Sequence, residues 1–153
     1  MAKAYFAAGC FWGIQQRFSR LDGVEKTTVG YMGGVTDSPE YESVCTGKTG
    51  HAEVVEVDYD SSVIDFGSLL SYFFDWHDPT EVNRQGPDIG TQYRTAIFPQ
   101  TDKQLSKAEE KINQLSRSGR YSRPIATNIE RADNFWPAED YHQHYLNKRG
   151  HGH

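Results

Sequence analysis

One of the two cysteines in this chain lies at a position that favours thiol reactivity. Cys10 falls within residues 9–13, Gly-Cys-Phe-Trp-Gly, where a short apolar run is predicted to end and a helix to begin. A thiol in the first turn of a helix meets unpaired backbone N–H groups and the positive end of the helix dipole, and both favour the thiolate. An average cysteine, by contrast, is a small buried apolar side chain. The position of Cys10 is therefore compatible with either a reactive nucleophile or a small buried side chain.

Two large rings follow this thiol, and a glutamate lies on a strand predicted further along the chain. Phe11 and Trp12 would either form an apolar recess beside Cys10 or fill the core. Residues 51–59 alternate in polarity, which places Glu53 on the same strand face as two valines. A carboxyl group in an apolar site is shifted towards its neutral form and can donate a proton near neutral pH. On the strand pattern alone, an ordinary exposed glutamate is favoured over a buried acid.

The elements that would position these side chains alternate between strands and helices. The patterns predict strands at 3–9, 24–31, 51–59, 93–98 and 124–130, and helices at 10–20, 66–77, 101–117 and 138–146. The segments 32–50 and 78–92 have no periodicity, and loops of this length in a compact domain are usually functional. We therefore expect an α+β fold, a two-layer ferredoxin-like sheet with helices and long functional loops.

Length, charge and composition narrow the class of protein. The 153 residues suit a single domain over 1–153, and a net charge of −5 without a run of Lys or Arg argues against a nucleic-acid partner. The 9 Tyr, 8 Phe and 3 Trp are many for a polar sequence and indicate a ring-lined binding site. Neither a membrane span nor a signal peptide is apparent. A cytoplasmic protein with reduced thiols is expected.

Four motifs carry a resemblance to a known family. They are residues 9–13, Thr-Gly-His-Ala-Glu at 49–53, Gly-Thr-Gln-Tyr-Arg at 90–94 and Phe-Trp-Pro-Ala-Glu-Asp-Tyr-His at 135–142. In this order, over nearly the whole chain, they resemble the peptide methionine sulfoxide reductase A family. The resemblance implies a thiol-dependent enzyme that reduces the S epimer of methionine sulfoxide, free or in proteins, to methionine and so repairs oxidative damage.

The resemblance also implies roles for single residues. Cys10 matches the family's nucleophile, and Glu53 matches the acid that protonates the sulfoxide oxygen. Tyr41 and Tyr93 match two tyrosines whose hydroxyls hydrogen-bond this oxygen. Asp88 matches a loop aspartate that contacts the substrate main chain.

The same resemblance assigns the substrate methyl group and the recovery of the thiol. Phe11 and Trp12 would hold the S-methyl group, and attack would leave a sulfenic acid on Cys10 that another thiol must reduce. Many relatives carry resolving cysteines in a C-terminal tail, whereas residues 147–153 contain none, so Cys45 is the internal candidate. We favour an external thiol, from thioredoxin, glutaredoxin or glutathione, acting on a monomer without a bound cofactor.

The sequence alone leaves two other classes of function open. Cys10, His51 and Asp88 could form the triad of a cysteine hydrolase, which would leave Glu53 and the two tyrosines without a role. A non-enzymatic peptide-binding module would use only the aromatic surface.

The paired histidines of the C-terminal region are not expected to bind a metal. His142 and His144 would diverge on a helix, because neighbours on one helix face are three or four residues apart. His151 and His153 lie in a tail that would not preorganise ligands.

Overall fold

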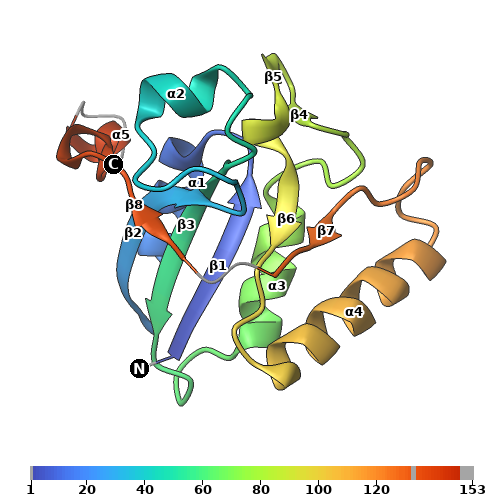
Figure 1. Cartoon of the computed structure of the whole chain (residues 1–153). Coiled ribbons are helices and arrows are strands. Elements are labelled where there is room, and N and C mark those ends of the chain that lie inside the picture. Colours follow the sequence, from blue (N-terminus) through green and yellow to red (C-terminus); the bar gives the residue numbers. More distant parts are fainter. Residues whose placement is uncertain (1, 132–133, 149–153) are drawn as a thin grey trace.

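The computed structural model describes residues 2–131 and 134–148, which form a mixed α/β fold around a six-stranded sheet (Figure 1). Its strands are β1 (Ala2–Ala8), β2 (Val24–Met32), β3 (Ala52–Tyr59), β6 (Thr95–Ile97), β7 (Asn128–Ile129) and β8 (Trp136–Pro137). Their order is β7-β6-β1-β3-β2-β8, and every pair is antiparallel except β6 and β7, which are parallel. The N-terminal strand therefore lies inside the sheet.

Helices cover one face of this sheet. They are α1 (Phe11–Ser19), α3 (Phe66–Asp75) and α4 (Asp102–Arg117), and the larger hydrophobic core lies between them and the strands. The Phe6 ring of β1 lies 5.2 Å from that of Phe18 on α1 and 5.1 Å from that of Phe73 on α3, measured between centroids. Burial of such rings is the main source of stability at this face.

The alternation predicted for β3 is present in the structure. Val55, Val57 and Tyr59 join the larger core, whereas Ala52 and Val54 belong to a smaller cluster on the opposite face. By this alternation Glu53 faces the helix-covered side. In the register of β2 and β3 it lies directly opposite Tyr31, so the two side chains share a face.

Shorter elements lie at the end of the sheet where β1 gives way to α1. They are α2 (Tyr41–Cys45), the hairpin of β4 (Arg84–Gln85) and β5 (Asp88–Ile89), and the 3-10 turn η1 (Thr91–Tyr93). Figure 1 shows α2 and the hairpin on this side of the molecule. The 3-10 turn η2 (Asp140–His142) and α5 (Tyr145–Lys148) end the described chain. None of the described helices is long and apolar enough to cross a bilayer.

Several predicted boundaries are correct and others are wrong. The helix predicted at 101–117 is α4, with the Thr101 side chain accepting a hydrogen bond from the Gln104 N–H as its cap. The strand predicted at 124–130 pairs over only two residues. The helix predicted at 138–146 is divided into η2 and α5, because His144 adopts a φ of 54°, which no α-helix tolerates.

Candidate active site

Cys10 occupies the junction between the central strand β1 and helix α1. The preceding Gly9 has a φ of 86°, and a Cβ atom there would lie 2.8 Å from the Cβ of Gln85, so the turn requires glycine. Cys10 is the N-cap residue of α1 and is half-buried. The backbone therefore presents the thiol at the edge of the helix-covered core.

The pKa of the Cys10 thiol is raised rather than lowered at this position. Burial raises it to about 12, with further contributions from the charges of Glu53 and Asp88, while the backbone N–H groups of Trp12 and Gly13 lower it. The sequence prediction of helix-end donors is correct, but the expected net effect is wrong because burial is the larger influence. The resting group is a thiol at neutral pH.

Glu53 is buried beside this junction, with 1% of its surface exposed. One carboxyl oxygen, Oε1, accepts a hydrogen bond of 3.3 Å from the backbone N–H of Phe11, the first residue of α1. The other, Oε2, is buried without a hydrogen-bond partner among the described residues. Burial raises the pKa of Glu53 to about 8, the Phe11 N–H lowers it and the charge of Asp88 raises it further. At neutral pH this carboxyl group carries a proton.

Two tyrosine hydroxyls share the same electrostatic environment. Tyr41 is the first residue of α2 and Tyr93 the last of η1, and both are half-buried. Burial raises the pKa of Tyr93 to about 12, followed by the charges of Glu53 and Cys45. Burial and a hydrogen bond to Cys45 raise the pKa of Tyr41 above its usual range. Both hydroxyls stay protonated and can donate hydrogen bonds.

The two rings after Cys10 have different surroundings. Phe11 is buried, and its ring centroid lies 5.7 Å from that of Tyr31. Trp12 is half-buried and stacks on Tyr145 at 3.9 Å between centroids. The indole Nε1 donates a 3.0 Å hydrogen bond to Nδ1 of His142. The half-buried indole is thus fixed at its edge and on one face.

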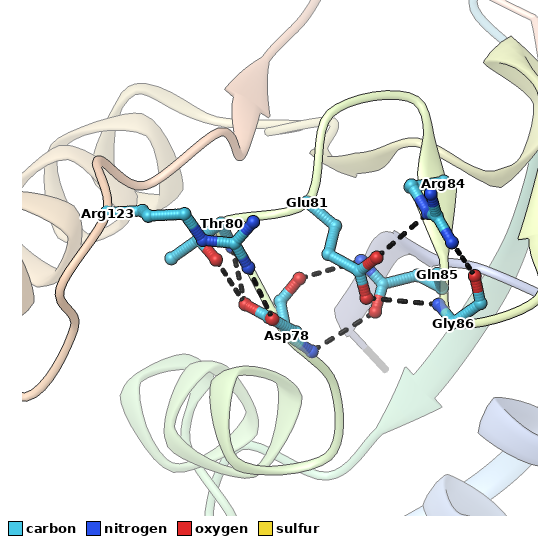
Figure 2. Close-up of polar contacts among 7 residues, drawn as sticks. All are labelled: Asp78, Thr80, Glu81, Arg84, Gln85, Gly86 and Arg123. Carbon is cyan, nitrogen blue, oxygen red and sulfur yellow. Dashed lines mark hydrogen bonds and ion pairs between the residues drawn. The ribbon is translucent and has the colours of Figure 1, made fainter.

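Asp88 lies on the β4–β5 hairpin, in a loop held by its own polar contacts (Figure 2). The Gln85 side chain bonds both the N–H and the carbonyl of Asp78, at 3.1 and 2.7 Å. Glu81 accepts from the Gly86 N–H at 3.0 Å, and Arg84 pairs with Glu81 at 3.1 Å. These contacts fix the turn immediately before Asp88, whose charge raises the pKa values of Cys10, Glu53 and Tyr93.

His51 does not join this group as a hydrolase base would. Its Nδ1 accepts from the Gly34 N–H at 3.0 Å, and its Nε2 lies 2.7 Å from the Thr36 carbonyl. Both ring nitrogens of a buried imidazole are therefore occupied by backbone groups. The hydrolase alternative is not favoured.

The other histidines singled out in the sequence do not form a metal centre in the described part of the chain. No group of three or more His, Cys, Asp or Glu side chains there is arranged to hold a metal ion. His142 instead packs among aromatic rings. His151 and His153 lie outside the described residues.

Two residues near the site have contacts that the sequence did not predict. His142 is buried, and its Nε2 has no hydrogen-bond partner among the described residues. Glu139 accepts hydrogen bonds from Tyr31 and Tyr41. Both residues belong to the motif at 135–142, and this motif was the one sequence feature that could have drawn attention to them. Their contacts join segments about a hundred residues apart in the chain, so no local sequence pattern predicts these contacts.

A half-buried thiol beside a neutral carboxylic acid and two protonated tyrosines is suited to a thiol-dependent oxidoreductase. The sequence model of the family described as peptide methionine sulfoxide reductase matches residues 2–153. The chain is 53% identical over 152 residues to "Peptide methionine sulfoxide reductase MsrA" of Methanoculleus marisnigri, covering 99% of this chain and 93% of that protein. The chain belongs to the peptide methionine sulfoxide reductase family.

Solved structures agree with this membership. Reduced Mxr1 of Saccharomyces cerevisiae superposes with a TM-score of 0.85 at 40% identity, covering 99% of this chain and 87% of that one. Mxr1 in complex with Trx2 superposes with a TM-score of 0.60 at 28% identity, covering 94% and 84%. The mixed α/β fold is therefore shared with these structures.

Proposed function

We propose that this protein reduces the S epimer of methionine sulfoxide, free or within proteins, to methionine, and so repairs oxidative damage. The observation that carries the proposal is the carboxyl group of Glu53, which is buried and neutral next to the Cys10 junction. The uncharged acid has a proton to donate, and sulfoxide oxygen leaves only when protonated.

In the first step, the Cys10 sulfur attacks the sulfoxide sulfur while Glu53 gives its proton to the sulfoxide oxygen. This attack forms a bond between the two sulfur atoms. The protonated oxygen then moves from the substrate sulfur to the Cys10 sulfur as the sulfur–oxygen bond of the substrate and the sulfur–sulfur bond both break, so methionine leaves and Cys10 is left as a sulfenic acid. The thiol proton of Cys10 restores the proton of Glu53, so no proton is gained or lost overall. Sulfoxide sulfur is reduced by two electrons and Cys10 is oxidised by two.

The surrounding side chains would select and orient the substrate. The hydroxyls of Tyr41 and Tyr93 donate hydrogen bonds to the oxygen, where negative charge develops in the transition state. Phe11 and Trp12 hold the S-methyl group. Asp88, on the hairpin loop, accepts a hydrogen bond from the substrate main chain. Separate places for oxygen and methyl explain why one epimer would react.

The sulfenic acid is then reduced by an external dithiol, and a thioredoxin is our first choice. One thiol of the reductant displaces water to form a mixed disulfide with Cys10, and its second thiol releases Cys10 as the reductant becomes a disulfide. A relative that crystallised with Trx2 supports a thioredoxin partner. Glutaredoxin and glutathione could supply the same two electrons. Thioredoxin, glutaredoxin and glutathione are all kept reduced in the cytoplasm, and we propose that the reaction takes place there.

We expect the chain to act as a single-domain monomer. The order β6-β1-β3-β2, with α1 and α3 as the crossing helices, supports a ferredoxin-like core for this domain.

The proposal is tested by following racemic N-acetyl-methionine sulfoxide with the protein and dithiothreitol on a chiral column. We expect the S epimer to disappear and the R epimer to persist, with methionine derivative formed in equal amount to the sulfoxide lost. Loss of both epimers at one rate, or hydrolysis of the acetyl group without sulfoxide loss, would refute the proposed function.

A further inference from the structure

The carboxylate of Glu139 joins three segments of the chain behind the proposed site. Its Oε1 accepts a hydrogen bond of 3.0 Å from the hydroxyl of Tyr31 on β2. Its Oε2 accepts one of 3.1 Å from the backbone N–H of Tyr41, the first residue of α2, and a longer one of 3.4 Å from the Tyr141 hydroxyl. One side chain thus connects the sheet, α2 and the C-terminal segment.

The charged form of Glu139 is the form that these donors stabilise. Burial raises the pKa of Glu139, but hydrogen bonds from its own and the Tyr41 backbone N–H and from the Tyr31 hydroxyl outweigh burial, so the pKa lies below its usual value. Hydrogen bonds to an ionised acceptor are about twice as strong as those between neutral groups.

The two ends of helix α2 are held by different segments: at its far end the Cys45 carbonyl accepts a 3.3 Å hydrogen bond from the Gln92 side chain, so Glu139 concerns the first turn. The helix has five residues, and only Val44 among them is buried. A helix of this length is not stable by itself. The Glu139 carboxylate holds its first N–H, and the buried ring of His142 lies 4.3 Å from the Tyr41 ring, between centroids.

On the sheet side, Glu139 accepts its hydrogen bond from Tyr31 of β2, the strand that pairs with the strand of Glu53. Tyr31 is fully buried and lies opposite Glu53 in the register of β2 and β3. Because Tyr31 and Tyr41 bind the same carboxylate, the start of α2 is held relative to the strand pair that carries Glu53. Glu139 thus connects the segment that carries Tyr41 to a strand that pairs with the strand of Glu53.

We propose that Glu139 is a positioning residue for the reaction: it holds Tyr41 so that the phenol donates to the same oxygen that Glu53 protonates. The inference rests on the proposed function and deepens it. It requires that the effect of Glu139 on catalysis pass through the Tyr41 hydroxyl.

A double-mutant cycle between Glu139 and Tyr41 tests this requirement. Glu139→Ala removes all three acceptor contacts and should lower kcat/KM for the S sulfoxide about tenfold in the wild-type chain. In a Tyr41→Phe chain, where no hydroxyl needs to be aimed, the same change should cost less than about twofold. Glu139→Gln keeps the side-chain shape and one acceptor and should give an intermediate loss; it replaces Glu139→Ala in the cycle if the alanine variant does not fold.

The matched control is Glu42→Gln, which removes a negative charge from the exposed surface of α2 without touching Glu139. This variant should keep wild-type kcat/KM. An equal loss from Glu139→Ala in both backgrounds, or a Tyr41→Phe variant with full activity, would overturn the proposal.

Amide hydrogen exchange at Tyr41 separates this inference from the proposed function, because it needs no catalysis. Exchange should accelerate about tenfold or more in Glu139→Ala and stay unchanged in Glu42→Gln. If the wild-type protein reduces no sulfoxide, the proposed function fails and exchange alone decides whether Glu139 holds Tyr41. Unchanged exchange in Glu139→Ala would overturn the inference in either case.

Discussion

The two cysteines of this chain lie in regions that differ in almost every physical respect. Cys10 is half-buried between a seven-residue strand and a nine-residue helix that buries Phe11, Ile14 and Phe18. Cys45 is exposed, at the end of a five-residue helix with a single buried side chain. The Cys10 region is thus part of the core, whereas the Cys45 region is held by hydrogen bonds at both ends of the short helix, from its first N–H to Glu139 and from Gln92 to the Cys45 carbonyl.

Both thiols have raised pKa values, so a low pKa does not mark either of them as the nucleophile. Burial is the first cause for each, and the charge of Glu53 contributes to both. The difference lies in the neighbours of Cys10, because the N–H of the next residue, Phe11, donates a hydrogen bond to the buried acid Glu53. A nucleophile for a sulfoxide needs a neighbouring acid more than a low pKa, because the oxygen must be protonated as the sulfur is attacked.

The largest effect is expected from Cys10→Ser. Serine is close to cysteine in size and is a favourable N-cap residue, but it cannot form a sulfenic acid, so dithiothreitol-dependent sulfoxide loss should fall by at least about 10³-fold. Chiral chromatography of the substrate measures this, with circular dichroism to verify the fold. Substantial residual activity would remove Cys10 as the nucleophile.

Glu53→Gln should produce the next largest effect. The amide oxygen can still accept from the Phe11 N–H, but no proton is available, so kcat/KM should fall about 10²- to 10³-fold while iodoacetamide still alkylates Cys10. The matched control is Glu56→Gln on the opposite face of the same strand, where Glu56 accepts from Tyr5. Similar losses in both variants would indicate a general effect on β3 rather than a missing acid.

The pH dependence of the first step should follow the pKa of Glu53. The reactive form carries protons on both Glu53 and Cys10, and since the Glu53 pKa is about 8, the rate should be constant below this value and decline above it. From pH 7 to pH 9 the expected decrease is about tenfold. Single-turnover rates, which exclude the recycling thiol, measure it. A rate that increases through pH 8 would show that the thiolate, not the acid, limits the reaction.

Cys45→Ser should have the smallest effect. With dithiothreitol as reductant we expect less than about a twofold change in turnover, because an exposed thiol outside the core takes no part in attack or recovery. A change of tenfold or more would make Cys45 a participant and would remove the distinction between the two regions.

The Cys10 region could be predicted from the sequence because its signals are local. An apolar run, a glycine and a helical repeat follow one another over about twenty residues, and the alternation of 51–59 identifies the face of Glu53. The position of Tyr41 could not be predicted in this way. It depends on Glu139, 98 residues away in the chain, and α2 is too short to show a period. The split of 138–146 at His144 depends on a backbone angle that the residue type does not specify.

The state of the two cysteines after a single turnover tests the central claim most directly. The reduced protein is mixed with an excess of S sulfoxide without any reductant, then trapped with dimedone and analysed as intact protein and as peptides. We predict one dimedone adduct per chain, on Cys10, with Cys45 still a free thiol. A stoichiometric disulfide between Cys10 and Cys45, or an adduct on Cys45, would contradict the account.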